Sequence, residues 1–169
     1  MFRRVALVII LLGSSVPAAA ETPRVSMDRY GVFRVGMSEL EAARIAGHQL
    51  VRDDRDGGET ECFYASSPQL PEGVNLMFLD GRLARIDVSE PEVATLSGTK
   101  IGTTERQLKQ MYGHRLSQEP HKYDWPIGHY FTLLSSDGSR GVRFETDGVR
   151  VTGYYAGTAE AIHLAEGCQ

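Results

Sequence analysis

The sequence predicts an α+β fold made of two tandem repeats, each a short helical segment packed on an antiparallel β-sheet. Three observations support this prediction: a helix-start sequence occurs twice, apolar and polar residues alternate in several segments, and each half contains an Asp-Gly pair. The 169 residues, 41% hydrophobic and 24% charged, exclude a disordered or collagen-like chain. The net charge of −4 argues against nucleic acid as the main partner.

Residues 1–20 predict a secretory signal peptide. Arg3 and Arg4 precede eight apolar residues (5–12), and small residues lead up to Ala20. Eight apolar residues are too few to cross a bilayer, which needs about 20. We therefore expect cleavage after Ala20, a periplasmic or secreted location, and no membrane anchor.

The chain has two cysteines, Cys62 and Cys168. In an oxidising compartment we expect them to form a disulfide that ties the C-terminal tail, residues 157–169, to the first half. Two unpaired buried thiols are the alternative. Two cysteines so far apart would need histidine partners to bind a metal, and the sequence places none; we predict no metal and no cofactor.

The first repeat covers residues 30–90. Ser38 and Glu41 have the spacing of a capping box, and Gly47 suits the left-handed position after a helix. Alternating segments at 61–66, 74–78 and 84–88 predict strands, and Asp80-Gly81 predicts a two-residue type I′ turn. The stripe of this helix that we expect to be buried consists of Ala42, Ile45 and Ala46.

The second repeat covers residues 91–156. Residues 101–105 (Ile-Gly-Thr-Thr-Glu) match residues 35–39 (Val-Gly-Met-Ser-Glu) 66 positions earlier. A second capping box, a helix-ending Gly113 and an Asp147-Gly148 turn are expected in the same order. The corresponding elements are the capping pair Thr104 and Gln107, the stripe Leu108, Met111 and Tyr112, and strands at 129–134, 142–145 and 149–152.

The segment Phe33-Arg34-Val35-Gly36-Met37-Ser38, a short helix ending in glycine and the hairpins that follow resemble a superfamily with two groups. One group is the secreted β-lactamase inhibitor protein, and the other is the small lipoprotein subunit of the outer-membrane protein assembly machinery. The resemblance covers residues 30–155 and implies helices packed on an antiparallel sheet, with a curved sheet and loops that grip a partner enzyme. The chain lacks the lipidation cysteine and the single unit of the lipoproteins, and it has fewer cysteines than the inhibitor. No inhibitory residue is carried over, because no loop of this sequence matches the contact loops of the inhibitor.

The sequence contains no motif that nominates an enzyme. His48 and His114 follow the helix-ending glycines, where an imidazole can meet the last helical carbonyls. The spacing of His121 and His129 fits no compact zinc signature. We expect no catalytic activity, and keep an unrecognised hydrolase using His121 or His129 as an alternative.

The polar positions of the strands define a second face of the predicted sheet, which we expect to be in water. A mixed-charge face suits a polar protein contact, although a face that only keeps the protein soluble is the simpler interpretation. Its candidate binding residues are Arg85, Arg143 and Arg150. The residues expected to project from this face are Arg85, Asp87, Arg143, Glu145, Arg150 and Thr152.

The segment 121–130 is the second candidate surface. Trp125, the only tryptophan, lies outside the strand pattern and is the better candidate for an exposed anchor, with Tyr123 beside it. Tyr130 matches Tyr64 at a strand position and is expected to pack between the two repeats.

These patterns favour a secreted or periplasmic protein-binding module whose partner is another envelope or secreted protein. One form of this hypothesis is an inhibitor of an envelope or antibiotic-degrading enzyme. An envelope assembly or structural factor is the alternative, and carbohydrate binding through Tyr123 and Trp125 is a variant of the first.

Overall fold

The computed structural model describes residues 23–53 and 61–168. The predicted signal peptide and residues 54–60 lie outside the described residues. In chain order the elements are β1 (Arg29–Tyr30), β2 (Phe33–Arg34), α1 (Glu39–Ala46), β3 (Val51–Arg52), β4 (Cys62–Ser66), β5 (Val74–Leu79), β6 (Arg82–Val88), α2 (Glu105–Tyr112), η2 (Gly113–Arg115), β7 (Leu116–Pro120), β8 (His129–Leu134), β9 (Arg140–Thr146), β10 (Val151–Thr158) and η3 (Ala161–His163).

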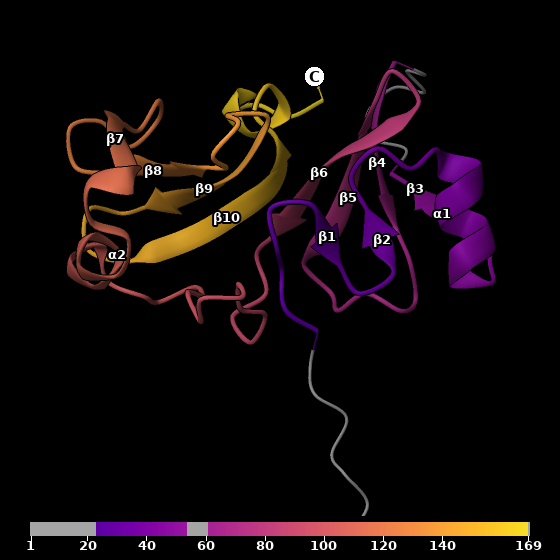
Figure 1. The fold of residues 1–169 in the computed structure, drawn as a ribbon, viewed down its shortest axis with the longest axis horizontal. Coiled ribbons are helices and arrows are strands. Elements are labelled where there is room, and N and C mark those ends of the chain that lie inside the picture. The colour runs from indigo at the N-terminus through magenta and orange to yellow at the C-terminus, as the bar shows by residue number, and fades with distance from the viewer. Residues whose placement is uncertain (1–22, 54–60, 169) are drawn as a thin grey trace, which may run out of the picture.

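An antiparallel sheet dominates the described residues (Figure 1). Its eight strands have the order β3-β4-β5-β6-β10-β9-β8-β7, and a separate small hairpin pairs β1 with β2. Strands β6 and β10 pair at the centre, where Val88 lies opposite Tyr154. The predicted α+β class with an antiparallel sheet is confirmed; the short edge strands β3 and β7 and the β1–β2 hairpin are additions to the prediction.

Both predicted capping boxes are present. In α1, the Ser38 hydroxyl accepts from the Glu41 backbone N–H at 3.2 Å, and the Glu41 carboxylate accepts from the Ser38 N–H at 2.8 Å. Thr104 and Gln107 repeat both distances in α2. Gly47 ends α1 in the left-handed region, at φ 76° and ψ 11°. The helix starts are local features, and the sequence was sufficient to place them.

Two details of the helices differ from the prediction. Gly113 has φ 57° but ψ −134°, which is not the left-handed helical region, because the chain continues directly into η2. Ile45 and Met111 are 53% and 43% exposed, so neither helix buries the full predicted stripe. The two helices lie towards opposite ends of the sheet, and each buries a narrower row (Figure 1). The helical residues that are buried are Ala42, Ala46, Leu108 and Tyr112.

The two Asp-Gly turns are different. Asp80 and Gly81 have φ angles of 50° and 72° and form the predicted two-residue link between β5 and β6. Asp147 instead accepts hydrogen bonds on its Oδ1 from the N–H groups of Val149 and Arg150, at 2.9 and 2.8 Å. This side-chain turn places four residues between β9 and β10, so the prediction of a two-residue turn was wrong there.

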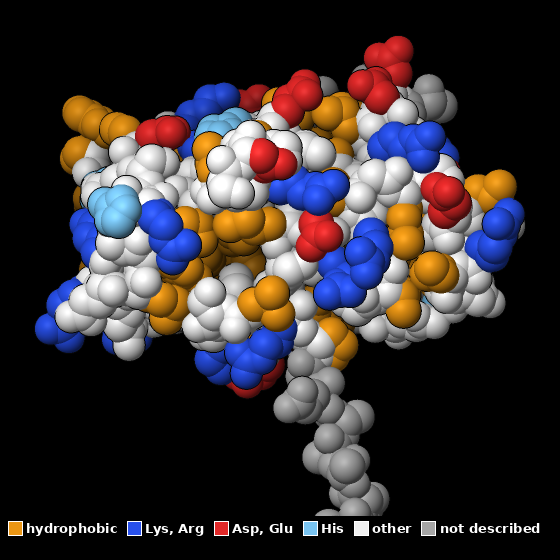
Figure 2. All heavy atoms as spheres, in the orientation of Figure 1, with side chains coloured by type: hydrophobic (Ala, Val, Ile, Leu, Met, Phe, Trp, Pro, Cys, Tyr) orange, Lys and Arg blue, Asp and Glu red, His pale blue; other side chains and the backbone are white. Residues whose placement is uncertain are grey.

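The sheet face towards the helices forms the hydrophobic core. Leu76 and Ile86 are fully buried, and the rings of Phe63 and Phe78 stack at 5.0 Å. On the face drawn in Figure 2, hydrophobic side chains line a hollow of about 330 Å³ between α2 and the N-terminal segment. Residues lining this hollow include Val25, Met27, Tyr112, Leu133 and Val142.

The opposite face of the sheet is not open to water at its centre. Arg85 and Arg143 are 2% and 4% exposed, which contradicts the prediction that both project into solvent. The C-terminal segment covers Arg85, and Arg143 lies between Tyr130 and neighbouring polar side chains. Arg150, just before β10, and Thr152, near its start, are exposed as predicted.

No helix among residues 23–53 and 61–168 combines the length and the apolar character needed to span a membrane.

Candidate functional site

The predicted disulfide joins Cys62 on β4 to Cys168, with the two Cα atoms 5.3 Å apart. It closes a separation of 106 residues and fastens the C-terminal segment to the first half of the sheet. By the chain-entropy model, a closed loop of this length is worth about 4–5 kcal/mol. The disulfide therefore holds the cover of the second sheet face in place.

Arg85 lies beneath the C-terminal segment, at the centre of a polar network in which all three of its side-chain nitrogens donate hydrogen bonds. Its Nε donates to Asp87 Oδ1 at 2.6 Å, and its Nη2 donates to Asp87 Oδ2 and to the Tyr64 hydroxyl, both at 2.7 Å. Its Nη1 donates to the carbonyl oxygens of Ala161 and Leu164 at 2.8 and 2.7 Å. Burial opposes the charge of Arg85, but the Asp87 carboxylate outweighs this effect, and the pKa of the guanidinium is raised. All of these contacts lie inside the protein and leave Arg85 unable to contact a partner.

Arg143 forms a second polar network, in which fewer of its N–H groups have a hydrogen-bond partner. Its Nη1 donates to Thr132 Oγ1 and its Nη2 to Glu119 Oε2, both at 2.9 Å. Its guanidinium lies 4.1 Å from the centre of the Tyr130 ring. Its Nε has no hydrogen-bond partner within the described part of the chain.

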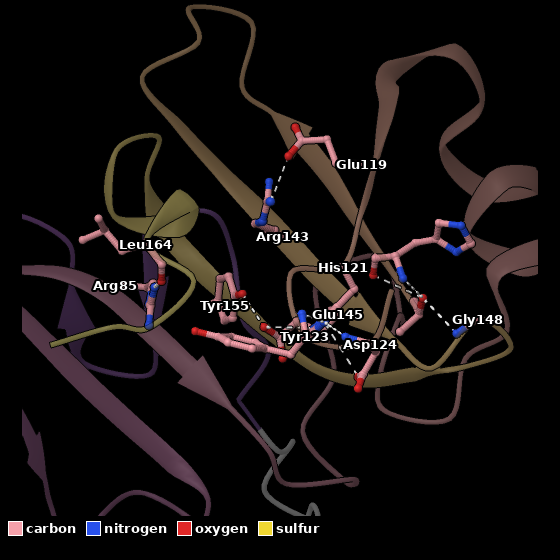
Figure 3. A network of polar contacts seen from close by, with 12 residues as sticks. Arg85, Glu119, His121, Tyr123, Asp124, Arg143, Glu145, Gly148, Tyr155 and Leu164 are labelled. Atoms are coloured by element: carbon pink, nitrogen blue, oxygen red, sulfur yellow. Dashed lines mark hydrogen bonds and ion pairs between the residues drawn. The ribbon is translucent and has the colours of Figure 1, made fainter. Parts of the chain in front are cut away.

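Tyr155 and Glu145 extend the Arg85 network towards His121 (Figure 3). The Tyr155 hydroxyl donates to Glu145 Oε1 at 2.6 Å, and the guanidinium of Arg85 lies 4.4 Å from the Tyr155 ring centre. Burial, reinforced by the Glu145 carboxylate, raises the pKa of Tyr155. Asp87, Glu145 and Tyr155 also line a shallow hollow of about 220 Å³.

The loop of residues 121–128, here called the aromatic loop, is held in its conformation by hydrogen bonds to a buried histidine. His121 is 7% exposed, and its ring stacks on Tyr130 at 4.3 Å. Its Nδ1 accepts hydrogen bonds from the backbone N–H groups of Tyr123 and Asp124, at 3.2 and 3.1 Å. The loop closes where the His121 N–H donates to the Gly128 carbonyl at 2.9 Å.

The aromatic loop presents apolar side chains to solvent. Tyr123, Trp125 and Ile127 are 59%, 71% and 66% exposed, and Val149 in the neighbouring turn is 59% exposed. The turn lies directly against the loop, because a Cβ on residue 148 would come within 2.5 Å of the Ile127 carbonyl oxygen, and Gly148 has φ +89°. These four side chains are called the exposed patch below.

Two further contacts hold the aromatic loop from outside. Glu166 of the C-terminal segment pairs with the Lys122 ammonium and accepts a hydrogen bond from the Tyr123 hydroxyl. The hydrogen bond and charge of Lys122 lower the pKa of Glu166. The loop is thereby linked to the segment that ends in Cys168.

The end of the aromatic loop is tied to α2. Glu105 Oε1 lies 2.8 Å from His129 Nδ1 and accepts a hydrogen bond from Thr146 Oγ1 at 2.7 Å. His121 and His129, the alternative catalytic histidines, thus lie at opposite ends of the loop and have different partners.

The structure brings together only part of the predicted site. Tyr123 and Trp125 lie in one exposed patch, whereas Arg85 and Arg143 are buried beneath other segments. Arg150 lies apart from them, with its Nη1 donating to the Gly102 carbonyl at 3.3 Å near the start of α2. Tyr130 is 3% exposed, but it lies on β8, away from the junction of β6 and β10, and its ring contacts His121 and Arg143 of the second half.

Sequence reasoning missed the fastening role of His121 and the link through Glu145. Both depend on atoms that meet only in the folded chain, and no local pattern marks them. Within residues 23–53 and 61–168, no three His, Cys, Asp or Glu side chains are grouped so that they could hold a metal ion.

Comparisons with protein-family models, with curated proteins and with solved structures gave no significant match.

Proposed function

We propose that this protein is a secreted or periplasmic binding module that recognises another protein through the exposed patch. The observation that carries the proposal is the position of Tyr123, Trp125 and Ile127. All three are more than half exposed on a loop whose backbone is fixed by a buried side chain. Tryptophan and tyrosine contribute most to protein interfaces, and a fixed loop loses little conformational entropy on binding.

The composition of the patch favours a protein partner over a sugar. Ile127 and Val149 add aliphatic surface beside the aromatic rings, and the Tyr123 hydroxyl is already engaged by Glu166. Sugar sites need several polar groups directed at the ligand in addition to an aromatic platform. The patch instead has the mixture typical of the centre of a protein interface.

A tandem duplication is the proposed origin of the fold. Each helix is followed in the chain by four strands of the sheet. Arg82 Nη1 donates to the Gly36 carbonyl at 3.2 Å, and Arg150 Nη1 donates to the Gly102 carbonyl at 3.3 Å. These paired contacts support two related units and, with them, the resemblance to the β-lactamase inhibitor and assembly lipoprotein superfamily.

Secretion is part of the same proposal. The pattern of residues 1–20 supports export, and a disulfide between Cys62 and Cys168 is compatible with an oxidising compartment outside the cytoplasm.

The test compares capture by the wild-type protein with capture by Trp125→Ala and by Leu40→Ala. Leu40 is a matched control because it is 70% exposed but lies on α1. We expect the wild type and Leu40→Ala to retain one specific protein from a periplasmic extract with equal affinity. Trp125→Ala should weaken that affinity by about 30-fold or more, the loss of a hot-spot residue.

Equal affinity for Trp125→Ala and the wild type would overturn the proposal, as would retention of a sugar or lipid and no protein. The identity of the captured protein also distinguishes the inhibitor hypothesis from the assembly-factor hypothesis. An envelope or antibiotic-degrading enzyme would support an inhibitor, and an outer-membrane protein would support an assembly factor.

A further inference from the structure

The contacts of His121 define its protonation state. One nitrogen, Nδ1, accepts two backbone N–H bonds at the start of the aromatic loop. A ring nitrogen can accept only when it carries no proton, so the ring is neutral and its proton is on Nε2. The observed conformation of the loop therefore requires the neutral form of His121.

The surroundings of His121 contain both signs of charge. Asp124 Oδ2 lies 3.8 Å from Nδ1, and Glu145 Oε1 lies 3.9 Å from Nε2. On β8, Tyr130 stacks on the ring, and the Arg143 guanidinium contacts Tyr130 in turn. Tyr123 lies 6.3 Å away on the loop, and Tyr155 of β10 reaches the site through its hydrogen bond to Glu145.

The two carboxylates give the protonated ring an alternative arrangement. A proton on Nδ1 would face the N–H groups of Tyr123 and Asp124 and convert two hydrogen bonds into repulsive contacts. The same proton could instead be donated to the Asp124 carboxylate after a small movement, while Nε2–H faces Glu145. The charged form thus favours a different path of the backbone at residues 123–124.

We propose that His121 is a pH-sensitive latch, whose protonation releases the aromatic loop and weakens partner binding in acid. The inference rests on the proposed function of the exposed patch, because it concerns the regulation of that surface. Histidine is the side chain whose unperturbed charge change falls between about pH 5 and pH 8. If protonation of this one group releases the loop, the fraction of molecules with the observed loop conformation falls as the protonated fraction rises.

The first test needs no partner. NMR spectra recorded from about pH 8 to about pH 5 report the tautomer of His121 and the loop amides. At neutral pH we expect the Nε2–H tautomer. On acidification, the amides of Tyr123 and Asp124 and the indole of Trp125, the only tryptophan, should shift with the midpoint of His121. An Nδ1–H tautomer at neutral pH, or loop amides that do not follow His121, would refute the latch.

The matched variant is His121→Asn, whose amide oxygen can take the place of Nδ1 as an acceptor but does not titrate. It should keep the neutral-pH loop spectrum in acid, whereas His114→Asn, at an exposed position, should behave like the wild type. A loop transition that survives in His121→Asn would also overturn the proposal. If His121→Asn does not fold, the wild-type titration alone decides the question.

The binding test separates this inference from the proposed function. The captured partner should bind the wild type several-fold more weakly at pH 5 than at pH 7.5, and His121→Asn should remove most of that difference. An equal loss in His121→Asn would refute the latch and leave the exposed patch intact as the binding surface. Binding that is insensitive to Trp125→Ala would refute the proposed function, even if the NMR transition is observed.

Discussion

The second face of the sheet carries one buried arginine in each half, and the two have different surroundings. Arg85 uses all three nitrogens, in five hydrogen bonds, and the C-terminal segment covers it. Arg143 makes two hydrogen bonds, one of them to Glu119, whose side chain is 49% exposed. Both guanidinium groups lie against a tyrosine ring, at 4.4 and 4.1 Å.

The two arginines therefore differ in how completely the rest of the protein satisfies and covers them. Around Arg85 all five hydrogen bonds go to other groups of the protein, and a disulfide holds the C-terminal segment that covers it. Beside Arg143, the Tyr130 ring also stacks on His121 of the aromatic loop, which presents Trp125 and Ile127 to solvent. We infer that the first half of this face is closed for stability and that the second half supports a binding surface.

The largest expected effect comes from removing the disulfide that attaches the C-terminal segment to the first half of the sheet. The double variant Cys62→Ser/Cys168→Ser should lower the free energy of unfolding by about 4 kcal/mol, because the open chain regains the entropy that the long closed loop had removed. Urea unfolding measures this loss. A decrease below about 1 kcal/mol would mean that the disulfide does not constrain the chain as described.

The next effect tests the comparison of the two arginines. Arg85→Met should lower the free energy of unfolding by about 3 kcal/mol, because it leaves Asp87 without its buried counter-charge and two carbonyls without donors. Arg143→Met should cost only about 1–2 kcal/mol, because Glu119 can turn to water. Urea unfolding of the two variants under one condition gives the difference. Equal losses would remove the distinction between the halves.

A small effect with a defined pH dependence is expected at the turn between β8 and β9. Hydrogen bonds from Ser135 and from the backbone and side chain of Ser139 lower the pKa of Asp137 from 3.8 to about 2. Because the folded-state pKa is lowered, the stabilisation is present above pH 3.8 and is lost as the pH falls towards 2.

Asp137→Asn should therefore have a slightly lower melting temperature than the wild type at pH 6, and the difference should close near pH 2. Circular dichroism at a series of pH values measures it. A difference that grows on acidification would have the wrong sign for this explanation.

The accuracy of the sequence predictions depended on how far apart in the chain the interacting residues lie. The capping pairs and the Asp80-Gly81 turn act over a few residues, and they were predicted at the right positions. The disulfide was predictable because the chain offers only two cysteines. Trp125 was predicted to be exposed because it lies outside the strand pattern, and it is 71% exposed.

The errors arose where a distant segment decides the environment. Alternation places Arg85 and Arg143 on the polar face, but it does not reveal what covers that face. The C-terminal segment that covers Arg85 accepts through backbone carbonyls, which every residue has. The role of His121 depends on backbone N–H groups in the same way, so its side chain gave no signal in the sequence.

The most direct test of the account places a photo-cross-linking amino acid at one of two exposed positions, Ile127 or Leu40, in the full-length chain produced in living cells. Both side chains are largely exposed, at 66% and 70%, but only Ile127 belongs to the exposed patch. Irradiation should join the protein to one specific partner from position 127 and to none from position 40. Cross-linking of that partner from position 40 alone would contradict the assignment of the binding surface.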